Sequence, residues 1–162
     1  MSALPACGFE PLYGRNAATN ASAEMAAIRI MPIKDRIGQE TQNHLLDLVT
    51  PHGRPARPEY ILEVELTESF SNVAVSKESF ATRVNYHLTA RFTLLDARTN
   101  KSVFYGNDRN ITSYNVLTSN FATQAAENDA RSRAARQIAF GIQTQLAAFL
   151  KNRSFRTGAD KK

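Results

Sequence analysis

Apolar and polar residues alternate over long stretches in the middle of the chain. Residues 83–95 place apolar side chains on one side of an extended strand and polar side chains on the other; the apolar set is Val84, Tyr86, Leu88, Ala90, Phe92 and Leu94. A similar alternation starts at Tyr60, and turn residues at 96–100 precede a third strand at 102–114. Consecutive strands of this kind predict an antiparallel meander that is covered on one face only.

A short strand and a helix are predicted before these strands. Residues 27–33 alternate and contain a proline near their end, which indicates a first strand. Asp35 is the expected N-cap of a helix that ends near Val49. The apolar stripe of this helix consists of Ile37, Leu45, Leu48 and Val49.

A second predicted helix closes the chain. It runs from about Phe121 to Lys151, with Ser119 or Asn120 as its N-cap. Its apolar stripe comprises Ala134, Ala135, Ile138, Ala139, Ile142, Leu146, Phe149 and Leu150. Its opposite, polar side comprises Glu127, Asp129, Arg131, Arg133, Arg136 and Gln143. We expect the apolar stripe to cover one face of the sheet.

The order of these elements predicts the α+β class. Strand, helix, three strands and helix give a two-layer sandwich, with two helices packed on one face of a four-stranded, mainly antiparallel sheet (β-α-β-β-β-α). We expect a single domain over residues 25–151, an N-terminal segment over 1–24 and a basic flexible tail over 152–162. Within the N-terminal segment, the small polar residues at 15–24 suit a linker.

Composition places the chain among ordinary globular domains and limits its partners. Of 162 residues, 43% are hydrophobic and 22% are charged. Most of the net charge of +5 sits on residues 151–162, so the remaining body carries little excess positive charge. Nucleic-acid binding needs a basic folded face and is therefore not expected. An anionic lipid or glycolipid partner needs fewer charges and fits this distribution better.

No group of residues has the spacing that catalysis or metal binding requires. The one cysteine, Cys7, excludes an internal disulfide and a thiolate metal cluster, and the three histidines are far apart. The chain has no Gly-x-Ser-x-Gly elbow and no glycine-rich phosphate loop. Glu63, Glu65 and His87 fit solvated strand residues. We therefore predict a protein that is not an enzyme, with no catalytic residue, no metal and no cofactor.

The surroundings of Cys7 indicate covalent lipid attachment. Leu4-Pro5-Ala6-Cys7-Gly8 has an aliphatic residue three positions before the cysteine, a small residue directly before it and a glycine after it. This pattern resembles the lipobox of bacterial lipoproteins, in which the cysteine is acylated and becomes the mature N-terminus. The alternative is that Cys7 is an incidental thiol.

The residues after Cys7 extend the resemblance to one family. Cys7-Gly8-Phe9-Glu10-Pro11-Leu12-Tyr13-Gly14 is similar to the start of mature LPS-assembly lipoproteins, the LptE family. The predicted order of strands and helices matches that family, and so does the closing helix with Glu127-Asn128-Asp129-Ala130-Arg131. The resemblance covers roughly residues 7–150.

This resemblance implies a non-enzymatic lipoprotein at the periplasmic face of the outer membrane, held there by acyl chains such as palmitate on Cys7. It also implies two partners besides the membrane, which are the LPS-assembly β-barrel and lipopolysaccharide. The domain would bind and plug the barrel and assist the insertion of lipopolysaccharide into the outer leaflet. Gly8 after the cysteine resembles the pattern of lipoproteins that are sorted to the outer membrane.

The resemblance further suggests where lipopolysaccharide would bind. In that family, basic residues are implicated near the hairpin after the second strand and in the loop before the last helix. Here the hairpin offers Lys77 and Arg83, beside Phe80, whereas residues 115–124 contain no lysine or arginine. Ordinary solvated charges are the alternative for Lys77 and Arg83.

Three other functions stay open on the sequence. A soluble periplasmic domain of cystatin-like α+β type would bind a protein partner through its sheet or hairpins. An RNA-binding α+β domain would bind in a manner that weakens steeply with salt. An enzyme would need a concave apolar cleft with titratable groups of shifted pKa.

Overall fold

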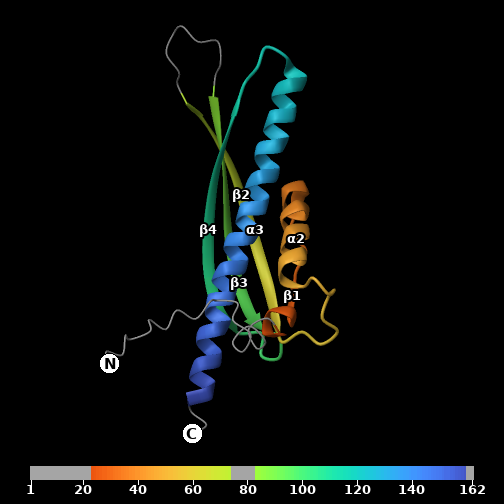
Figure 1. The fold of residues 1–162 in the computed structure, drawn as a ribbon, viewed down its shortest axis with the longest axis vertical. Coiled ribbons are helices and arrows are strands. Elements are labelled where there is room, and N and C mark those ends of the chain that lie inside the picture. Colours follow the sequence, from red (N-terminus) through yellow and green to blue (C-terminus); the bar gives the residue numbers. More distant parts are fainter. Residues whose placement is uncertain (1–22, 74–82, 160–162) are drawn as a thin grey trace, which may run out of the picture.

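Residues 23–73 and 83–159 are described by the computed structural model, with side chains described as far as Arg153. Their order is β1 (Ile28–Ile30), α2 (Asp35–Val49), β2 (Tyr60–Val73), β3 (Arg83–Asp96), β4 (Ser102–Asn115) and α3 (Asn120–Ala159). A helical turn at 23–26 precedes β1. Both long helices lie on one side of the sheet, so the α+β two-layer prediction is confirmed (Figure 1).

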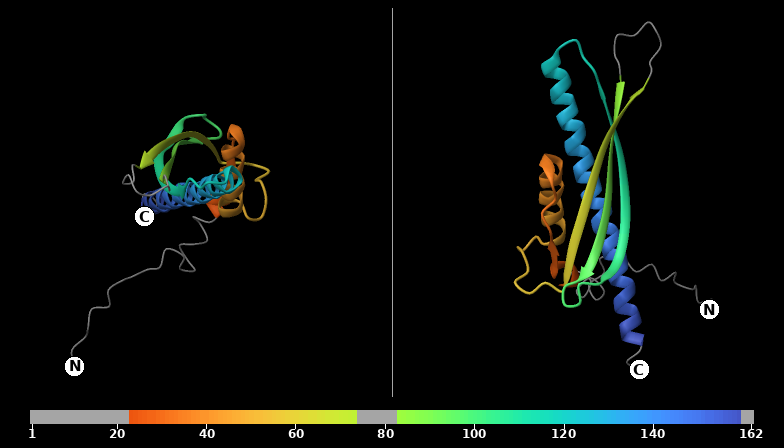
Figure 2. Two further views of the ribbon diagram at one scale, coloured as in Figure 1. Left: turned by 90° about the horizontal axis from the view of Figure 1, so that it is seen from above. Right: turned by 180° about the vertical axis from the view of Figure 1, so that it is seen from behind.

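The sheet is a meander with strand order β1-β2-β3-β4. β1 pairs with β2 in parallel over three residues, whereas β2, β3 and β4 are antiparallel along almost their whole length. Strands of 14 residues make the molecule elongated, and Figure 2 shows the sheet curving around α3. Because the strands and α3 run the length of the molecule, segments that are far apart in the sequence lie at the same end of it.

The core lies between the sheet and α3. All six apolar residues predicted to share one face of β3 are buried, from Val84 to Leu94. The opposing face of α3 is lined by fully buried residues, many of them small: Ala130, Ala134, Ala135, Ile138, Ala139, Ile142, Leu146 and Leu150. Each buried leucine or isoleucine contributes about 1.5–3 kcal/mol to folding. The alternating pattern of β3 therefore accounts for the central strand of the core.

Two glycines allow α3 to lie close to β4. A Cβ atom at Gly106 would meet the ring of Phe92 in the core, and one at Gly141 would meet the carboxylate of Asp108. Both positions therefore require a residue without a side chain if their neighbours keep their places.

Several details of the helices differ from the sequence predictions. Asp35 is the first residue of α2, with a φ of 66°, and Lys34 occupies the N-cap position without a side-chain hydrogen bond. Leu48 is 39% exposed, and Leu46 packs against the core in its place. The prediction that Leu48 belongs to the buried stripe was wrong. Leu46 and Leu48 lie on opposite sides of the line through Leu45 and Val49, and the side that faces the core is that of Leu46.

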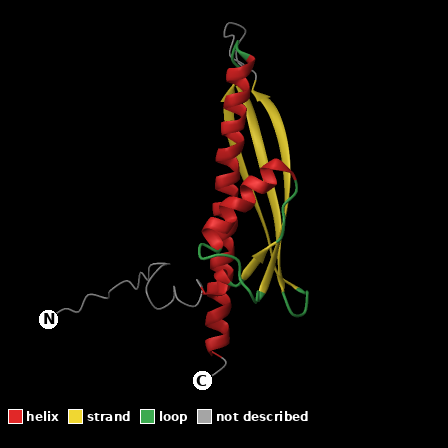
Figure 3. Ribbon diagram, turned by 90° about the vertical axis from the view of Figure 1, so that its right-hand side faces the viewer, coloured by secondary structure: helices red, strands yellow, loops and turns green. Residues whose placement is uncertain are grey.

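α3 also departs from its predicted limits and faces. It continues past Lys151 to Ala159, and the guanidinium carbon of Arg153 lies 5.6 Å from the ring centroid of Tyr60. Gln143 is buried rather than solvent-facing. Figure 3 shows α3 spanning the full height of the sheet, with the shorter α2 lying across its middle part. None of the helices within the described residues is both long enough and apolar enough to cross a membrane.

Candidate functional site

Four exposed apolar residues belong to the segments at one end of the sheet, where β2 ends, β3 begins and β4 leads into α3 (Figure 1). We call this region the tip and define it by Phe70, Val73, Arg83, Leu117 and Phe121. Phe121 is 83% exposed and Leu117 is 48% exposed, which is unusual for side chains of this size. Arg83 stands between Val73 and Asn115 in the register of the sheet and is exposed. The tip thus combines apolar surface with a cation.

Hydrogen bonds at the start of α3 hold the tip in place. The backbone N–H of Leu117 donates to Thr123 Oγ1 at 2.9 Å, and the Thr123 hydroxyl lies 3.2 Å from the Leu117 carbonyl oxygen. Ser119 Oγ accepts the backbone N–H of Ala122 at 3.4 Å, so the predicted cap at Ser119 is confirmed. The exposed apolar residues are therefore presented from a capped helix end.

Below the tip, Arg131 of α3 joins the helix to the sheet. Its guanidinium lies 3.0 Å from Glu127 Oε1 and 3.6 Å from Glu68 Oε2. The guanidinium carbon is also 5.5 Å from the ring centroid of Phe70 and 5.8 Å from that of Tyr86. The prediction that Arg131 faces solvent was wrong, because its long side chain turns toward β2 and β3.

Two tyrosines complete this cluster. The Tyr86 hydroxyl donates to Glu68 Oε2 at 2.8 Å, and the Tyr114 hydroxyl donates to Glu127 Oε2 at 3.5 Å. Burial, followed by the hydrogen bond to Glu68, raises the pKa of Tyr86 well above its ordinary value. Burial and the nearby Glu127 charge raise the pKa of Tyr114. Both tyrosines therefore stay protonated as donors, and the cluster ties α3 to all three long strands.

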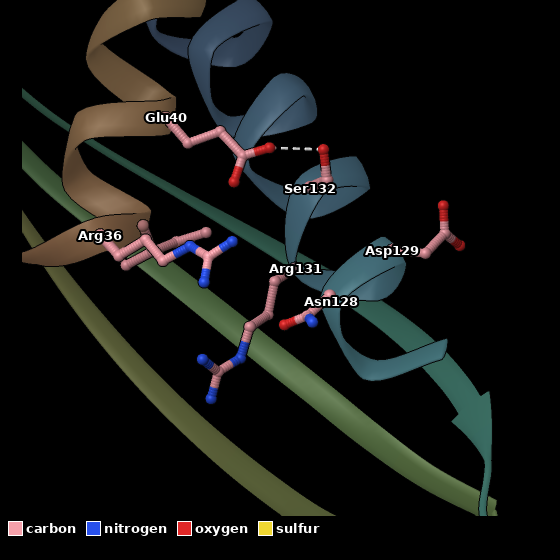
Figure 4. A pocket seen from close by; sticks show the side chains of 7 residues that line it. Arg36, Glu40, Asn128, Asp129, Arg131 and Ser132 are labelled. Atoms are coloured by element: carbon pink, nitrogen blue, oxygen red, sulfur yellow. Dashed lines mark hydrogen bonds between the residues drawn. The ribbon is translucent and has the colours of Figure 1, made fainter. Parts of the chain in front are cut away.

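A polar groove lies between α2 and α3 next to this cluster. It has a volume of about 360 Å³ and is lined by Arg36, Ile37, Glu40, Asn128, Asp129, Arg131 and Ser132. Figure 4 shows the side chains of both helices around it, with the Ser132 hydroxyl hydrogen-bonded to Glu40. Nε of Arg131 is buried and makes no hydrogen bond among the residues described. The lining is mixed in charge and offers no set of converging catalytic groups.

The face of the sheet that points away from the helices is mostly polar, and Tyr105 and Ile111 of β4, which pair with Thr93 and His87, expose apolar surface on it. His87 Nε2 lies 2.8 Å from Ser71 Oγ, and its Nδ1 lies 3.0 Å from a guanidinium nitrogen of Arg109. Because a guanidinium can only donate, Nδ1 accepts and Nε2 is the donor of a neutral ring. The Ser113 hydroxyl donates to Asn85 Oδ1 at 2.7 Å. This outer face therefore presents hydrogen-bonding groups from all three long strands.

The structure accounts for only part of the predicted site. Arg83 lies at the tip beside Val73, whereas Cys7, Lys77 and Phe80 lie outside the described residues. Glu63 and Glu65 are exposed, as predicted. Over residues 23–73 and 83–159, no cluster of three histidine, cysteine or acidic side chains could hold a metal ion. The apolar part of the tip was not predicted; Leu117 and Phe121 in an otherwise polar stretch were the available signal.

Similar chains occur among bacterial proteins. An uncharacterized protein of Rickettsia prowazekii (strain Madrid E) is 25% identical over 146 residues, which are 90% of this chain and 90% of that protein. A crystal structure from Caulobacter crescentus CB15 aligns with a TM-score of 0.67 and 23% identity, covering 83% of this chain and 98% of the other.

Rare lipoprotein B from Shewanella oneidensis has the same fold, with a TM-score of 0.53 at 12% identity over 78% of this chain and 98% of that one. The family described as LptE, lipopolysaccharide-assembly, matches residues 17–146, which is most of the chain. The chain therefore belongs to the LptE lipopolysaccharide-assembly family.

Proposed function

We propose that this protein is the lipoprotein subunit of an outer-membrane lipopolysaccharide-assembly complex. In this complex it binds and plugs the β-barrel partner and assists the insertion of lipopolysaccharide into the outer leaflet. The observation that carries the proposal is the family match over residues 17–146. We propose a role that is not enzymatic, as the match to a lipopolysaccharide-assembly family implies.

Acylation of Cys7 would hold the protein at the periplasmic face of the outer membrane. Each buried methylene of an acyl chain contributes about 0.8 kcal/mol, so two or more chains give a stable anchor. The small polar residues 15–24 would then connect this anchor to the domain, whose described part starts at Ala23.

The outer face of the sheet suits contact with the inside of a barrel. The lumen of such a barrel is lined by polar side chains. Ser71, His87 and Arg109 form a row of hydrogen-bonding groups across three strands, and Asn85 and Ser113 form a second one. This face can therefore exchange hydrogen bonds with a hydrated wall, and Tyr105 and Ile111 add local apolar contacts to it.

The tip suits a ligand that carries both phosphate and acyl chains. A guanidinium binds phosphate oxygens in a bidentate manner, and the exposed side chains of Leu117 and Phe121 offer apolar contact. Arg83 lies in the same region, and Lys77 belongs to the segment between β2 and β3. We propose Arg83 and Lys77 as the cationic contacts to lipopolysaccharide.

The test is expression of the full-length gene with its own signal, followed by isolation of the tagged protein from membranes. We expect a mature mass that includes acyl chains on Cys7, and co-purification of a large heat-modifiable barrel protein. The matched control is Cys7→Ala, which should lose the acyl mass and the membrane fraction. Recovery of the wild-type protein alone from the soluble fraction would contradict the proposal and favour the cystatin-like alternative.

A further inference from the structure

One edge of the sheet is open along half of its length. β1 pairs with β2 only as far as Leu62, where the backbone N–H of Met31 donates to the Leu62 carbonyl at 2.9 Å. Pro32 follows and has no N–H to continue the ladder. Along a strand, the N–H and C=O groups of successive residues point to opposite edges of the strand. The N–H and C=O groups of every second residue after Leu62 therefore face this open edge.

We call residues 66–72 of β2 the open edge. The outward backbone groups here belong to Leu66, Glu68, Phe70 and Asn72, and none of them has a backbone partner on this side within residues 23–73 and 83–159. Every residue from Thr67 to Val73 is exposed. An exposed row of unpaired N–H and C=O groups is a template for a further strand.

The opposite edge of the sheet is partly covered by side chains of α3. Gln145 Nε2 donates to the Asn107 carbonyl at 2.9 Å, and a guanidinium nitrogen of Arg133 lies 3.4 Å from the Ser113 carbonyl. These two carbonyls of β4 are therefore already occupied where a new strand would need them. β2 has no such cover from α3 or α2 among the hydrogen bonds of the described residues.

The side chains beside the open edge define what would fit there. On the helix side, the ring of Phe70 is 47% exposed and lies under Arg131, which also lines the groove. On the outer side, the neighbours are the small hydroxyl residues Thr67, Ser69 and Ser71. Below them, β2 carries Glu63 and Glu65 and has no basic residue.

We propose that the open edge of β2 binds an extended segment of the barrel partner as a fifth strand of the sheet. Seven residues at about 3.3 Å each give a pairing length of roughly 23 Å. The segment would alternate apolar residues, which contact Phe70, with small polar residues on the outer side. A lysine or arginine at its lower end would meet Glu63 and Glu65. This inference rests on the proposed function, because the barrel supplies the strand.

Residue-resolved hydrogen exchange on the complex, purified from membranes, tests this proposal. In the isolated lipoprotein, the outward amides of Leu66, Glu68 and Phe70 should exchange fast, whereas those of Thr67 and Ser69 are protected by pairing with β3. In the complex, exchange of the outward amides should slow by at least about tenfold, so that the difference between outward and inward amides disappears. If these amides still exchange fast in the complex, no strand is added at this edge and the inference is wrong, whereas the proposed function is unaffected.

A proline variant tests the same edge independently. Leu66→Pro removes an outward N–H but no bond to β3, so the sheet should still form, since edge strands accept proline at such positions. We expect barrel recovery to fall at least tenfold with Leu66→Pro and to change less than twofold with the matched control Leu66→Ala. Equal losses in both variants would show a side-chain contact and overturn strand addition.

Two other outcomes have a defined meaning. Protection that appears in the isolated protein and rises with its concentration would identify a second copy as the occupant and overturn the barrel segment. If the wild-type protein brings down no barrel at all, the proposed function fails and this inference fails with it.

Discussion

Arg131 of α3 lies over the ring of Phe70 of β2, with its guanidinium carbon 5.5 Å from the ring centroid. The same guanidinium is paired with Glu127 on its own helix and with Glu68 on β2. One side chain thus connects α3 to the part of β2 beyond the residues that pair with β1. This contact positions the tip and the open edge relative to the core.

Replacing Arg131 by methionine should destabilise the fold while keeping much of the apolar volume of its side chain. The variant loses two ion pairs and two cation–π contacts, all partly exposed, so we expect a loss of about 1–2 kcal/mol in the free energy of unfolding. Urea titration followed by circular dichroism measures this. The control is Arg133→Met, which breaks an exposed pair with Asp129 and a 3.4 Å contact to the Ser113 carbonyl and should cost below about 1 kcal/mol. Equal losses would contradict a special role for Arg131.

The two glycines at the helix–sheet contact should respond differently to alanine. Gly106→Ala places a methyl group against the Phe92 ring inside the core, and overpacking of this kind costs about 1–3 kcal/mol. Gly141→Ala meets only the end of the Asp108 side chain, which can move, and gains about 1 kcal/mol of helix propensity. We expect a lower Tm for the first variant and a Tm close to that of the wild type for the second. The reverse order would show that Asp108 is fixed in place.

Asp108 should make stability depend on pH in the acidic range. Burial raises the pKa of its carboxyl group above the ordinary value, and a hydrogen bond from the Arg109 backbone N–H offsets part of this. Between the ordinary pKa and the raised one, the folded state binds more protons, so the free energy of unfolding falls as pH rises. Asp108→Asn should remove this fall, and its stability relative to the wild type should grow from pH 3 to pH 7. Parallel pH profiles would contradict the prediction.

The cation at the tip should matter for function and not for folding. Arg83 and Arg98 are both exposed arginines close to the ends of β3, but only Arg83 lies at the tip. We expect Arg83→Ala to weaken binding of lipopolysaccharide to the purified protein by about tenfold or more, the size of one lost charge-assisted contact. Arg98→Ala should leave binding unchanged, and both variants should keep the wild-type Tm. Equal binding by the two variants would remove Arg83 from the site.

The apolar part of the tip can be tested by a polar substitution. Phe121 is 83% exposed, so Phe121→Ser removes little buried surface and should change the free energy of unfolding by less than about 0.5 kcal/mol. If acyl chains contact this ring, lipopolysaccharide binding should weaken several-fold in the same assay. A variant with lower stability and unchanged binding would assign Phe121 a structural role only.

The central strand could be predicted from the sequence because its two faces differ so sharply. Val84 to Leu94 are buried at every second position, and the outer positions carry hydrogen-bonding side chains. Ser119 was also predictable, since helix caps depend on a local bond to a nearby N–H. Local chemistry and simple periodicity thus define the elements and their order.

Contacts between elements that are distant in the sequence could not be predicted in this way. Arg131 lies at the border of the buried stripe of α3, and whether its side chain points to solvent depends on Glu68 and Phe70 on another strand. The opposition of Gly106 to Phe92 and of Gly141 to Asp108 depends on the register between α3 and β4. The open edge depends on where β1 stops, which is set by the parallel pairing with β2.

The hydrogen bonds from Gln145 and Arg133 to the carbonyls of β4 have a consequence for self-association. Copies held at one membrane surface, as proposed above, would meet at high local density, where sheets with two free edges can pair edge to edge and grow into fibres. Here two carbonyls of β4 already accept bonds from α3, so this edge is a poor template for the next copy. The structure therefore disfavours growth beyond the first pairing at β2.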